Sequence, residues 1–206
     1  MKHMEIEYKW DANSPRAFYR ATRALQTLCG TLTAQILPIQ DIYLDDTQHS
    51  LSKQLIALRV RNTGGKWEAT LKTRTKIKNG KATRREETLS LPHIQTQTQA
   101  LHALAKRKTW QGISTRDLVP QFTLTNKRTI YVFTYQGSTL EMALDRVSIY
   151  VAGRRVYMQE IELELKRGKT ENLEKFATIF SHQTKLQKAK ISKVKTAEML
   201  RKLWKN

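Results

Sequence analysis

Apolar and polar residues alternate with a period of two along most of this chain, a pattern typical of β-strands with two chemically different faces. In residues 4–10, Glu5, Glu7 and Lys9 share one face and four apolar side chains share the other. Similar alternation predicts further strands at 31–45, 54–62, 66–75, 82–91, 121–135, 138–151 and 155–166. Turn-forming pairs punctuate these runs: Gly64-Gly65, Asn79-Gly80, Gln136-Gly137 and Ala152-Gly153.

Helical spacing interrupts the strands. Ser14 and Pro15 are predicted as the N-cap and first turn of a helix that runs to about Leu28. Further helices are predicted at 94–108, 171–182 and 192–204, and a loop at 109–120 that ends in Pro120. A mainly antiparallel chain with intervening helices favours an α+β fold. The length of 206 residues fits a single domain, 1–206, with a basic helical segment from about residue 170.

Composition excludes several classes of protein. Hydrophobic residues make up 39% of the chain, which is too many for a disordered protein. The sequence has no apolar run of membrane-spanning length and no signal-peptide pattern at its start. Cys29 is the single cysteine, so neither an internal disulfide nor a cysteine-rich metal site is expected. We expect a cytoplasmic protein without a membrane partner, either a monomer or a homodimer.

Charge narrows the expected partners. There are 37 Lys and Arg against 18 Asp and Glu, a formal net charge of +19, which favours an anionic partner such as a nucleotide, polyphosphate or nucleic acid. The few acids gather in short runs, including Asp45-Asp46, Glu86-Glu87 and 160–164. A uniformly basic nucleic-acid binder has no need of such runs. They indicate cations bound inside a phosphate-binding site.

Several predicted strands have one face with charges of both signs and one apolar face. The charged faces hold Glu5, Glu7, Lys9, Arg59, Arg61, Glu68, Lys72, Arg84, Glu86, Arg128, Glu141, Asp145, Glu160, Glu162, Glu164 and Lys166, with Arg85 and Glu87 as a competing register. Two arrangements fit. An ordinary sheet would pack on its apolar side and leave the charges in water. A closed barrel with helices on its apolar exterior would bring the charges together in its lumen. The acids concentrate on the first and last strands of the sequence and the bases on the middle ones, which favours the barrel. Periodicity alone leaves both arrangements open.

The motifs along the chain, taken in order, resemble the CYTH or triphosphate tunnel metalloenzyme family. Glu5-Ile-Glu-Tyr-Lys9 is similar to its signature strand, and Tyr43-Leu-Asp45 followed by Arg59-Val-Arg61 to its next segment. The later matches are Thr70-Leu-Lys72, Arg84 with Glu86, Asn126-Lys-Arg128-Thr, the strand from Glu141 to Asp145, the strand from Glu160 to Gly168, and Ser192-Lys193. Two positions depart from the family pattern: Asp46 replaces a threonine, and Lys195-Thr-Ala replaces Arg-Gly-Tyr.

The resemblance implies a closed eight-stranded antiparallel β-barrel, the triphosphate tunnel, with helices packed outside. By position, the phosphate-binding residues would be Lys9, Arg59, Arg61, Lys72, Arg128 and Lys193. The ligands of one or two Mg²⁺ or Mn²⁺ ions would be Glu5, Glu7, Asp145, Glu160 and Glu162, with Glu141 and Glu164 as lesser candidates. The catalytic group would comprise Glu5, Glu7, Lys9 and Glu162. Arg84 would either contact substrate or pair with Glu86 in the tunnel wall.

The implied chemistry is metal-dependent hydrolysis of inorganic triphosphate to pyrophosphate and phosphate. The same tunnel would also suit hydrolysis of thiamine triphosphate or of a nucleoside or RNA 5′-triphosphate, or adenylate cyclisation. A hypothesis of a different class is a polyphosphate- or nucleic-acid-binding module that uses the basic C-terminal stretch, Lys185, Lys188, Lys190, Lys193, Lys195, Arg201, Lys202 and Lys205. A solvated helix face explains that stretch equally well.

Overall fold

The structure is a computed structural model that describes residues 2–73, 76–78 and 81–204. The longer strands are β1 (Lys2–Asp11), β2 (Gln35–Asp45), β3 (Ala57–Thr63), β4 (Lys66–Lys72), β6 (Lys81–Leu91), β9 (Val119–Tyr135), β10 (Ser138–Val151) and β11 (Arg154–Arg167). Short strands are β5 (Lys76–Lys78), β7 (Thr109–Trp110) and β8 (Ile113–Ser114). The helices are α1 (Ala17–Cys29), α2 (Ser50–Lys53), α3 (Gln97–Lys106), α4 (Thr170–Thr184) and α5 (Lys193–Trp204).

Within the described residues, eight strands close into an antiparallel barrel in the order β1-β11-β10-β9-β2-β3-β4-β6, and β6 returns to pair with β1. β1 is the closing strand, with Glu7 opposite Glu164 on β11 and Glu5 opposite Arg84 on β6. Strand β5 pairs with β6 outside this ring. Closure leaves none of the eight strands with a free edge in its paired region. The predicted α+β fold with a closed eight-stranded barrel is therefore confirmed.

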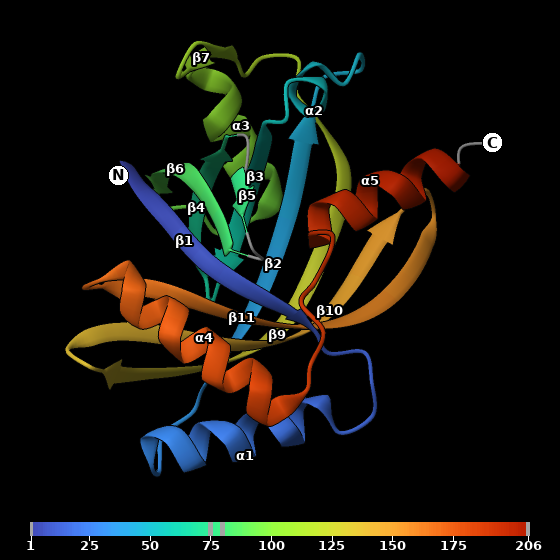
Figure 1. Cartoon of the computed structure of the whole chain (residues 1–206). Helices are drawn as coiled ribbons and strands as arrows, with labels where there is room; N and C mark the ends of the chain where they lie inside the picture. Colours follow the sequence, from blue (N-terminus) through green and yellow to red (C-terminus); the bar gives the residue numbers. More distant parts are fainter. Residues whose placement is uncertain (1, 74–75, 79–80, 205–206) are drawn as a thin grey trace.

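The barrel has its apolar face outside, and helices cover much of it (Figure 1). On one side α1 and α4 lie next to each other over β1, β10 and β11. Trp10, which is 0% exposed, meets the ring of Phe180 edge-on at 4.9 Å and donates a hydrogen bond from Nε1 to Ser181. The expectation of a sheet with its charged side in water is wrong, because the outward faces of these strands pack against helices.

A second apolar cluster lies beneath α2 and α3. Ala100 and Leu104 of α3 are buried with Val60 and Trp67 from the outer faces of β3 and β4. The side chain of Thr96 caps α3 by accepting a hydrogen bond from the backbone N–H of Gln99 at 3.2 Å. The helices thus bury the apolar half of each strand and leave the charged half to the interior.

Helix α5 closes the interior at one end. Its buried residue Ala197 packs in a cluster with Val147 and Ile149, which share the strand face of Asp145. Tyr43 and Phe122 stack in the same cluster, with ring centroids 4.8 Å apart. The interior is therefore apolar beside the later turns of α5 and charged beside its first turn. No helix in the described ranges is long and apolar enough to span a membrane.

Most predicted elements are present with shifted ends. The predicted turns at Gln136-Gly137 and Ala152-Gly153 are confirmed, because all four residues have positive φ angles between 48° and 78°, as type I′ turns require. The strand predicted at 31–45 begins only at Gln35, and the one predicted at 54–62 begins at Ala57 after the unpredicted helix α2. Parts of two predictions lie outside the described residues. They are residues 74–75, at the end of the strand predicted at 66–75, and the turn pair 79–80.

Two local predictions are wrong. Ser14 does not cap α1, because Arg16 has φ 63° in the left-handed region and the helix begins after it, at Ala17. The predicted loop 109–120 contains the hairpin β7–β8, and Pro120 lies inside β9. Pro120 pairs with Leu44 at a register shift in β2, a position where the missing N–H of proline is tolerated.

Candidate functional site

A charged cavity of about 310 Å³ lies inside the barrel. All eight barrel strands and the first turn of α5 contribute to its lining. The lining charged residues are Glu5, Lys9, Asp41, Arg59, Arg61, Glu68, Lys72, Arg84, Glu86, Arg128, Glu141, Glu162, Glu164, Lys166 and Lys193. Because the strands alternate, every second residue of each strand points into this space. The cavity thus unites charges that are far apart in the sequence.

Three carboxylates from β10 and β11 form an acidic group beside the cavity, which Glu162 lines. Oxygens of Asp145, Glu160 and Glu162 all lie within 4.8 Å of one another. The ammonium of Lys193 lies 2.8, 2.5 and 2.6 Å from them, respectively. Asp145 also accepts two hydrogen bonds from Arg128, at 2.7 and 2.6 Å. We call Asp145, Glu160 and Glu162 the carboxylate triad.

The start of α5 places Lys193 at the triad. Ser192 caps the helix, since its Oγ accepts a hydrogen bond from the N–H of Lys195 at 3.2 Å and its carbonyl accepts one from Thr196 at 2.9 Å. Lys193 is therefore the first helical residue, and its side chain enters the barrel. The Ser-Lys pair has a clear structural meaning: the serine starts the helix and the lysine reaches the acidic residues.

Strands β1, β4 and β6 build a second charged group. Arg84 contacts Glu5, Glu7 and Glu86, with its Nη2 3.1 Å from Glu7 and its Nε 3.2 Å from Glu86. Lys72 contacts Glu86 and lies 3.6 Å from Glu5. The register with Arg84 and Glu86 inside is therefore the correct one, and the pair predicted for the tunnel wall is formed.

Lys9 links the two groups. Its Nζ lies 2.5 Å from Glu162 in the triad and 3.2 Å from Glu7 on its own strand. The carboxylates raise the pKa of Lys9 above its ordinary value, against the opposing effect of burial. Lys9 therefore keeps its positive charge between the two sets of acids.

A third group, which sequence reasoning missed, centres on Asp41. Its carboxylate accepts hydrogen bonds from Nε and Nη2 of Arg61 at 2.6 and 2.7 Å, and Arg59 lies 3.7 Å away. Burial opposes ionisation of Asp41, but the two arginines outweigh it and hold its pKa at about 2. The signal in the sequence was its position two residues before Tyr43 on the same strand face.

Near Glu164 and Glu141 the cavity has fewer positive charges. Lys166 lies 3.1 Å from Glu164 and 4.0 Å from Glu141. Burial raises the pKa of Glu164 to about 7, and the carboxylates of Glu5 and Glu141 act in the same direction. The two lesser candidates therefore face the cavity as predicted, and each is near a lysine.

Burial shifts other groups of the site in opposite directions. Burial, with Arg84 and Arg59 nearby, lowers the pKa of Lys72 to about 8. Burial raises the pKa of Glu160, whereas the pKa of Glu162 is held far below its usual range by Lys193, Lys9 and Arg128 despite burial. Neighbouring carboxylates with such different proton affinities are characteristic of functional sites.

The carboxylate triad fits a divalent metal ion by its own chemistry. Mg²⁺ and Mn²⁺ prefer oxygen ligands, and three buried carboxylates supply them. Glu160 is 1% exposed, yet its Oε1 has no hydrogen-bond partner among the described residues. An oxygen left in that state is costly unless a cation or a donor engages it.

The basic C-terminal stretch is divided between interior and surface. Lys193 lies in the cavity, and Arg201 is buried with its Nη1 2.7 Å from Gln121 and within 2.8 Å of both ring nitrogens of His49. The exposed members are Lys185, Lys188, Lys190, Lys195 and Lys202, and Lys205 lies outside the described residues. The stretch is therefore not one continuous solvated face.

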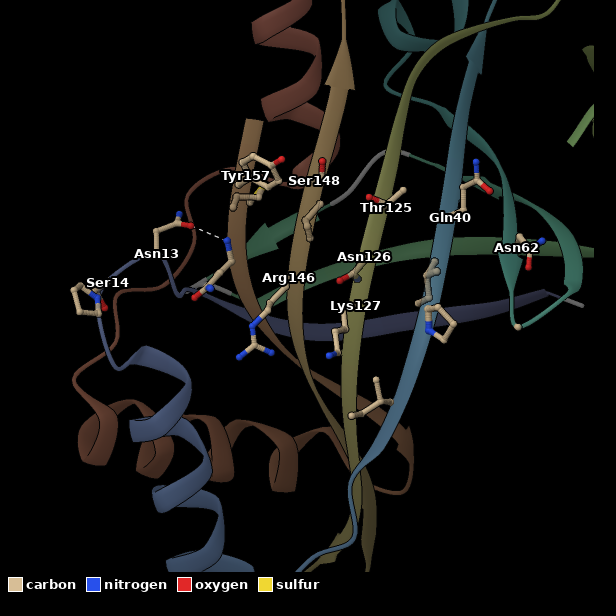
Figure 2. Close-up of a pocket in the computed structure, with 18 of the residues that line it drawn as sticks. Asn13, Ser14, Gln40, Asn62, Thr125, Asn126, Lys127, Arg146, Ser148 and Tyr157 are labelled. Carbon is tan, nitrogen blue, oxygen red and sulfur yellow. Dashed lines mark hydrogen bonds between the residues drawn. The ribbon is translucent and has the colours of Figure 1, made fainter. Parts of the chain in front are cut away.

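A larger concavity, of about 1540 Å³, lies over β2, β9, β10 and β11 (Figure 2). Lys127 and Arg146 extend from neighbouring strands there, and the Oδ1 of Asn13 accepts a hydrogen bond from the N–H of Gln159. The described residues that line it include no carboxylate. Because the described lining offers amide and hydroxyl oxygens but no carboxylate, the smaller charged cavity is the better candidate for a divalent metal site.

Residues 3–197 match the model of the CYTH domain. The chain belongs to the CYTH family. The predicted resemblance is confirmed, and the closed barrel with its charged interior is the structure expected for it. Every residue predicted for the site lies at the charged cavity, in the carboxylate triad or, for Glu7, in the second charged group around Arg84.

This CYTH chain is 30% identical over 169 residues, or 82% of its length, to an inorganic triphosphatase from Haemophilus influenzae. It spans about half of that relative, 47% of whose length is matched. Among solved structures, the chain is similar to a candidate adenylyl cyclase from Hippeastrum that has a dominant triphosphatase activity. The TM-score is 0.68, the sequence identity is 19%, and the match covers 96% of each chain. A protein from Pyrococcus horikoshii matches with a TM-score of 0.63 and 21% identity. That match covers 96% of this chain and 99% of the other. The structural likenesses support the fold.

Proposed function

We propose that this CYTH chain is a divalent-metal-dependent triphosphatase that hydrolyses inorganic triphosphate to pyrophosphate and phosphate. The observation that carries the proposal is one cavity bordered by a carboxylate triad and lined by several arginines and lysines. A linear anion with many phosphate oxygens fits such a cavity better than a compact anion would. The likeness to an inorganic triphosphatase supports the same reaction class.

The carboxylates hold the metal in this proposal. Asp145, Glu160 and Glu162 would hold one Mg²⁺ or Mn²⁺ ion, and Glu5 and Glu7 are the proposed ligands of a second. When bound, the metal neutralises phosphate charge and favours attack by water. Where no second ion occupies them, Glu5 and Glu7 would orient that water, and Glu7 would accept its proton.

The basic side chains bind the phosphate groups. Arg59 and Arg61 offer planar forks to phosphate oxygens, and the geometry of Arg61 is fixed by Asp41. Lys9, Lys72, Arg128 and Lys193 complete the set, with Arg84 as a further candidate. These groups stabilise charge on the transferred phosphoryl and on the leaving pyrophosphate. Each well-placed donor is worth roughly 3 kcal/mol of barrier.

Release of phosphate from tripolyphosphate tests this proposal. With Mg²⁺ or Mn²⁺ we expect one phosphate per tripolyphosphate and accumulation of pyrophosphate. Without divalent metal, or with excess chelator, release should stop. Release that persists under chelation would contradict the metal-dependent reaction.

An organic triphosphate is the second candidate substrate, because a partly apolar cavity adjoins the charged one. It measures about 440 Å³ and shares Lys9, Lys72 and Arg84 with the charged cavity. Its apolar lining includes Leu55, Ile56 and Ile191. A base or ring attached to the triphosphate would find apolar surface there.

A substrate panel separates these candidates. We expect tripolyphosphate to have the highest kcat/KM, ahead of ATP, thiamine triphosphate and a 5′-triphosphate RNA. A tenfold preference for one organic substrate would instead assign the apolar cavity to its organic group. Formation of cyclic AMP from ATP would identify adenylate cyclisation.

A further inference from the structure

Lys193 occupies the carboxylate triad. Its ammonium lies 2.5 to 2.8 Å from one oxygen each of Asp145, Glu160 and Glu162. Its side chain is only 15% exposed. An ammonium has three N–H donors, so these contacts use its full hydrogen-bonding capacity. Lys193 is therefore the counter-ion of the site in this structure.

These contacts conflict with metal binding. A divalent ion held by the triad needs the lone pairs that now accept hydrogen bonds from Lys193, at metal–oxygen distances of about 2.0–2.1 Å for Mg²⁺. An ammonium bound to the same oxygens would face the metal across a short distance, and the two positive charges would repel each other strongly in a buried site. The triad cannot hold both in this arrangement.

Lys193 also leaves the triad incompletely satisfied. Glu160 Oε1 is buried and has no hydrogen-bond partner among the described residues, although Oε2 of the same carboxylate contacts Lys193. A metal ion with six ligand positions can engage more oxygens than an ammonium with three donors. The unpartnered oxygen thus points to a ligand other than the lysine.

The other cations around the triad are held from different directions. Arg128 binds Asp145 through two parallel hydrogen bonds, and Lys9 lies between Glu162 and Glu7. Lys193 differs from both because it comes from the first turn of a helix rather than from a barrel strand. Its departure requires a shift of a side chain or of one helical turn, and leaves the barrel hydrogen bonds intact.

We propose that Lys193 is an exchangeable internal counter-ion, which a divalent metal displaces from the carboxylate triad. The displaced ammonium is then available to a phosphate oxygen of the substrate, since it borders the same cavity. Metal binding is thereby coupled to phosphate binding and to the first turn of α5. This inference rests on the proposed metal-dependent triphosphatase, but it concerns metal binding in the absence of substrate.

Direct Mn²⁺ binding to the whole protein tests the exchange. Free Mn²⁺ can be measured by electron paramagnetic resonance without triphosphate, for the wild type and for Lys193→Met, which keeps an unbranched side chain and removes the charge. We expect Lys193→Met to bind Mn²⁺ at least tenfold more tightly. Lys195→Met is the matched control, because Lys195 is exposed on the same helical turn and its loss changes net charge equally. Its Mn²⁺ affinity should stay within twofold of wild type.

A second variant tests whether the charge of Lys193 controls Mn²⁺ affinity, and a second measurement tests whether Mn²⁺ affects the start of α5. Lys193→Arg retains the charge and should not bind Mn²⁺ more tightly than wild type. In the wild type, Mn²⁺ alone should speed amide hydrogen exchange in the first turn of α5, at residues 194–197. Equal or weaker Mn²⁺ binding by Lys193→Met, or tightening by Lys195→Met to the same extent, would overturn the exchange.

Hydrolysis, measured separately, distinguishes the two proposals. If wild type hydrolyses tripolyphosphate and Lys193→Met binds Mn²⁺ no more tightly, the counter-ion exchange is wrong and the triphosphatase stands. If Lys193→Met binds Mn²⁺ more tightly but wild type hydrolyses no triphosphate, the exchange stands and the proposed reaction is wrong. Absence of Mn²⁺ binding to both proteins would overturn the exchange as well.

Discussion

Asp41 holds Arg61 through both carboxylate oxygens, at 2.6 and 2.7 Å, in the wall of the charged cavity. Asp41→Asn keeps the size of the side chain but leaves Arg61 without its charged partner. We expect the free energy of unfolding to fall by about 3 kcal/mol at pH 7, the scale for breaking a buried ion pair. Urea unfolding measures this change. The KM for triphosphate should rise as well, because Arg61 loses its fixed orientation.

The stability cost of Asp41→Asn should depend on pH. The folded-state pKa of Asp41, about 2, is below the ordinary value of 3.8, so its carboxylate stabilises the fold above pH 4. That contribution is lost as pH falls through 2. The stability difference between wild type and Asp41→Asn should therefore shrink by about a third between pH 7 and pH 3. A difference that stays constant over this range would show that Asp41 acts through packing alone.

The outer apolar layer should be essential for stability. Phe176 on α4 is fully buried, with its ring centroid 4.9 Å from that of Phe133 on β9. Phe176→Ala should lower the free energy of unfolding by about 3–5 kcal/mol. Tyr157 on β11 is the control, because it is 71% exposed, and Tyr157→Ala should cost less than about 0.5 kcal/mol. Equal effects of the two changes would contradict a barrel covered by helices on its apolar side.

The pKa of Lys72 predicts the alkaline limb of the activity profile. Burial and two neighbouring arginines lower this pKa to about 8, so the ammonium is lost as pH rises through 8. If the charged form binds phosphate, kcat/KM should fall about tenfold per pH unit above that value. Lys72→Met should have lower kcat/KM at pH 7 and should lack this limb. An unchanged alkaline limb in Lys72→Met would assign it to another group.

Removing the charge of a proposed metal ligand should affect turnover far more than folding. Glu5→Gln or Glu162→Gln should lower kcat at least 100-fold, on the scale of losing an electrostatic contact to the transition state. Unfolding free energies should change by less than about 2 kcal/mol, because Lys72, Arg84, Arg128 and Lys193 each keep another carboxylate partner. Glu87→Gln, next to Glu86 in sequence on the other face of β6, is the control. Wild-type rates in both site variants would remove the metal assignment.

The strands were predictable from the sequence because charges repeat at every second residue on strand after strand, and the closed barrel followed from the family resemblance. Residues such as Glu5, Glu7 and Lys9 needed only the period of two and the family motifs to be placed on one face. Where those charges would point could not be decided from alternation, since the same pattern serves a sheet in water. Closure between β1 and β6 resolves this, and it brings together residues such as Glu5 and Arg84 that no local pattern pairs.

The details that sequence reasoning missed depend on tertiary contacts. Asp41 was overlooked because its partners, Arg59 and Arg61, lie on the neighbouring strand. Asp45 matches a family motif, yet it accepts hydrogen bonds from the backbone N–H groups of Leu51 and Ser52 and thereby starts the short helix α2. The occupation of the triad by Lys193 also follows only from the position of α5.

Metal-dependent hydrolysis of tripolyphosphate is the most direct test of the whole account. Purified protein, tripolyphosphate and a series of divalent metals should give phosphate and pyrophosphate in equal amounts with Mg²⁺ or Mn²⁺. Glu162→Gln should form them at least 100-fold more slowly. Absence of phosphate release with every divalent metal, from protein whose circular dichroism spectrum shows a folded barrel, would contradict it. Strong, salt-sensitive and metal-independent binding of polyphosphate or RNA by that inactive protein would identify a binding module instead.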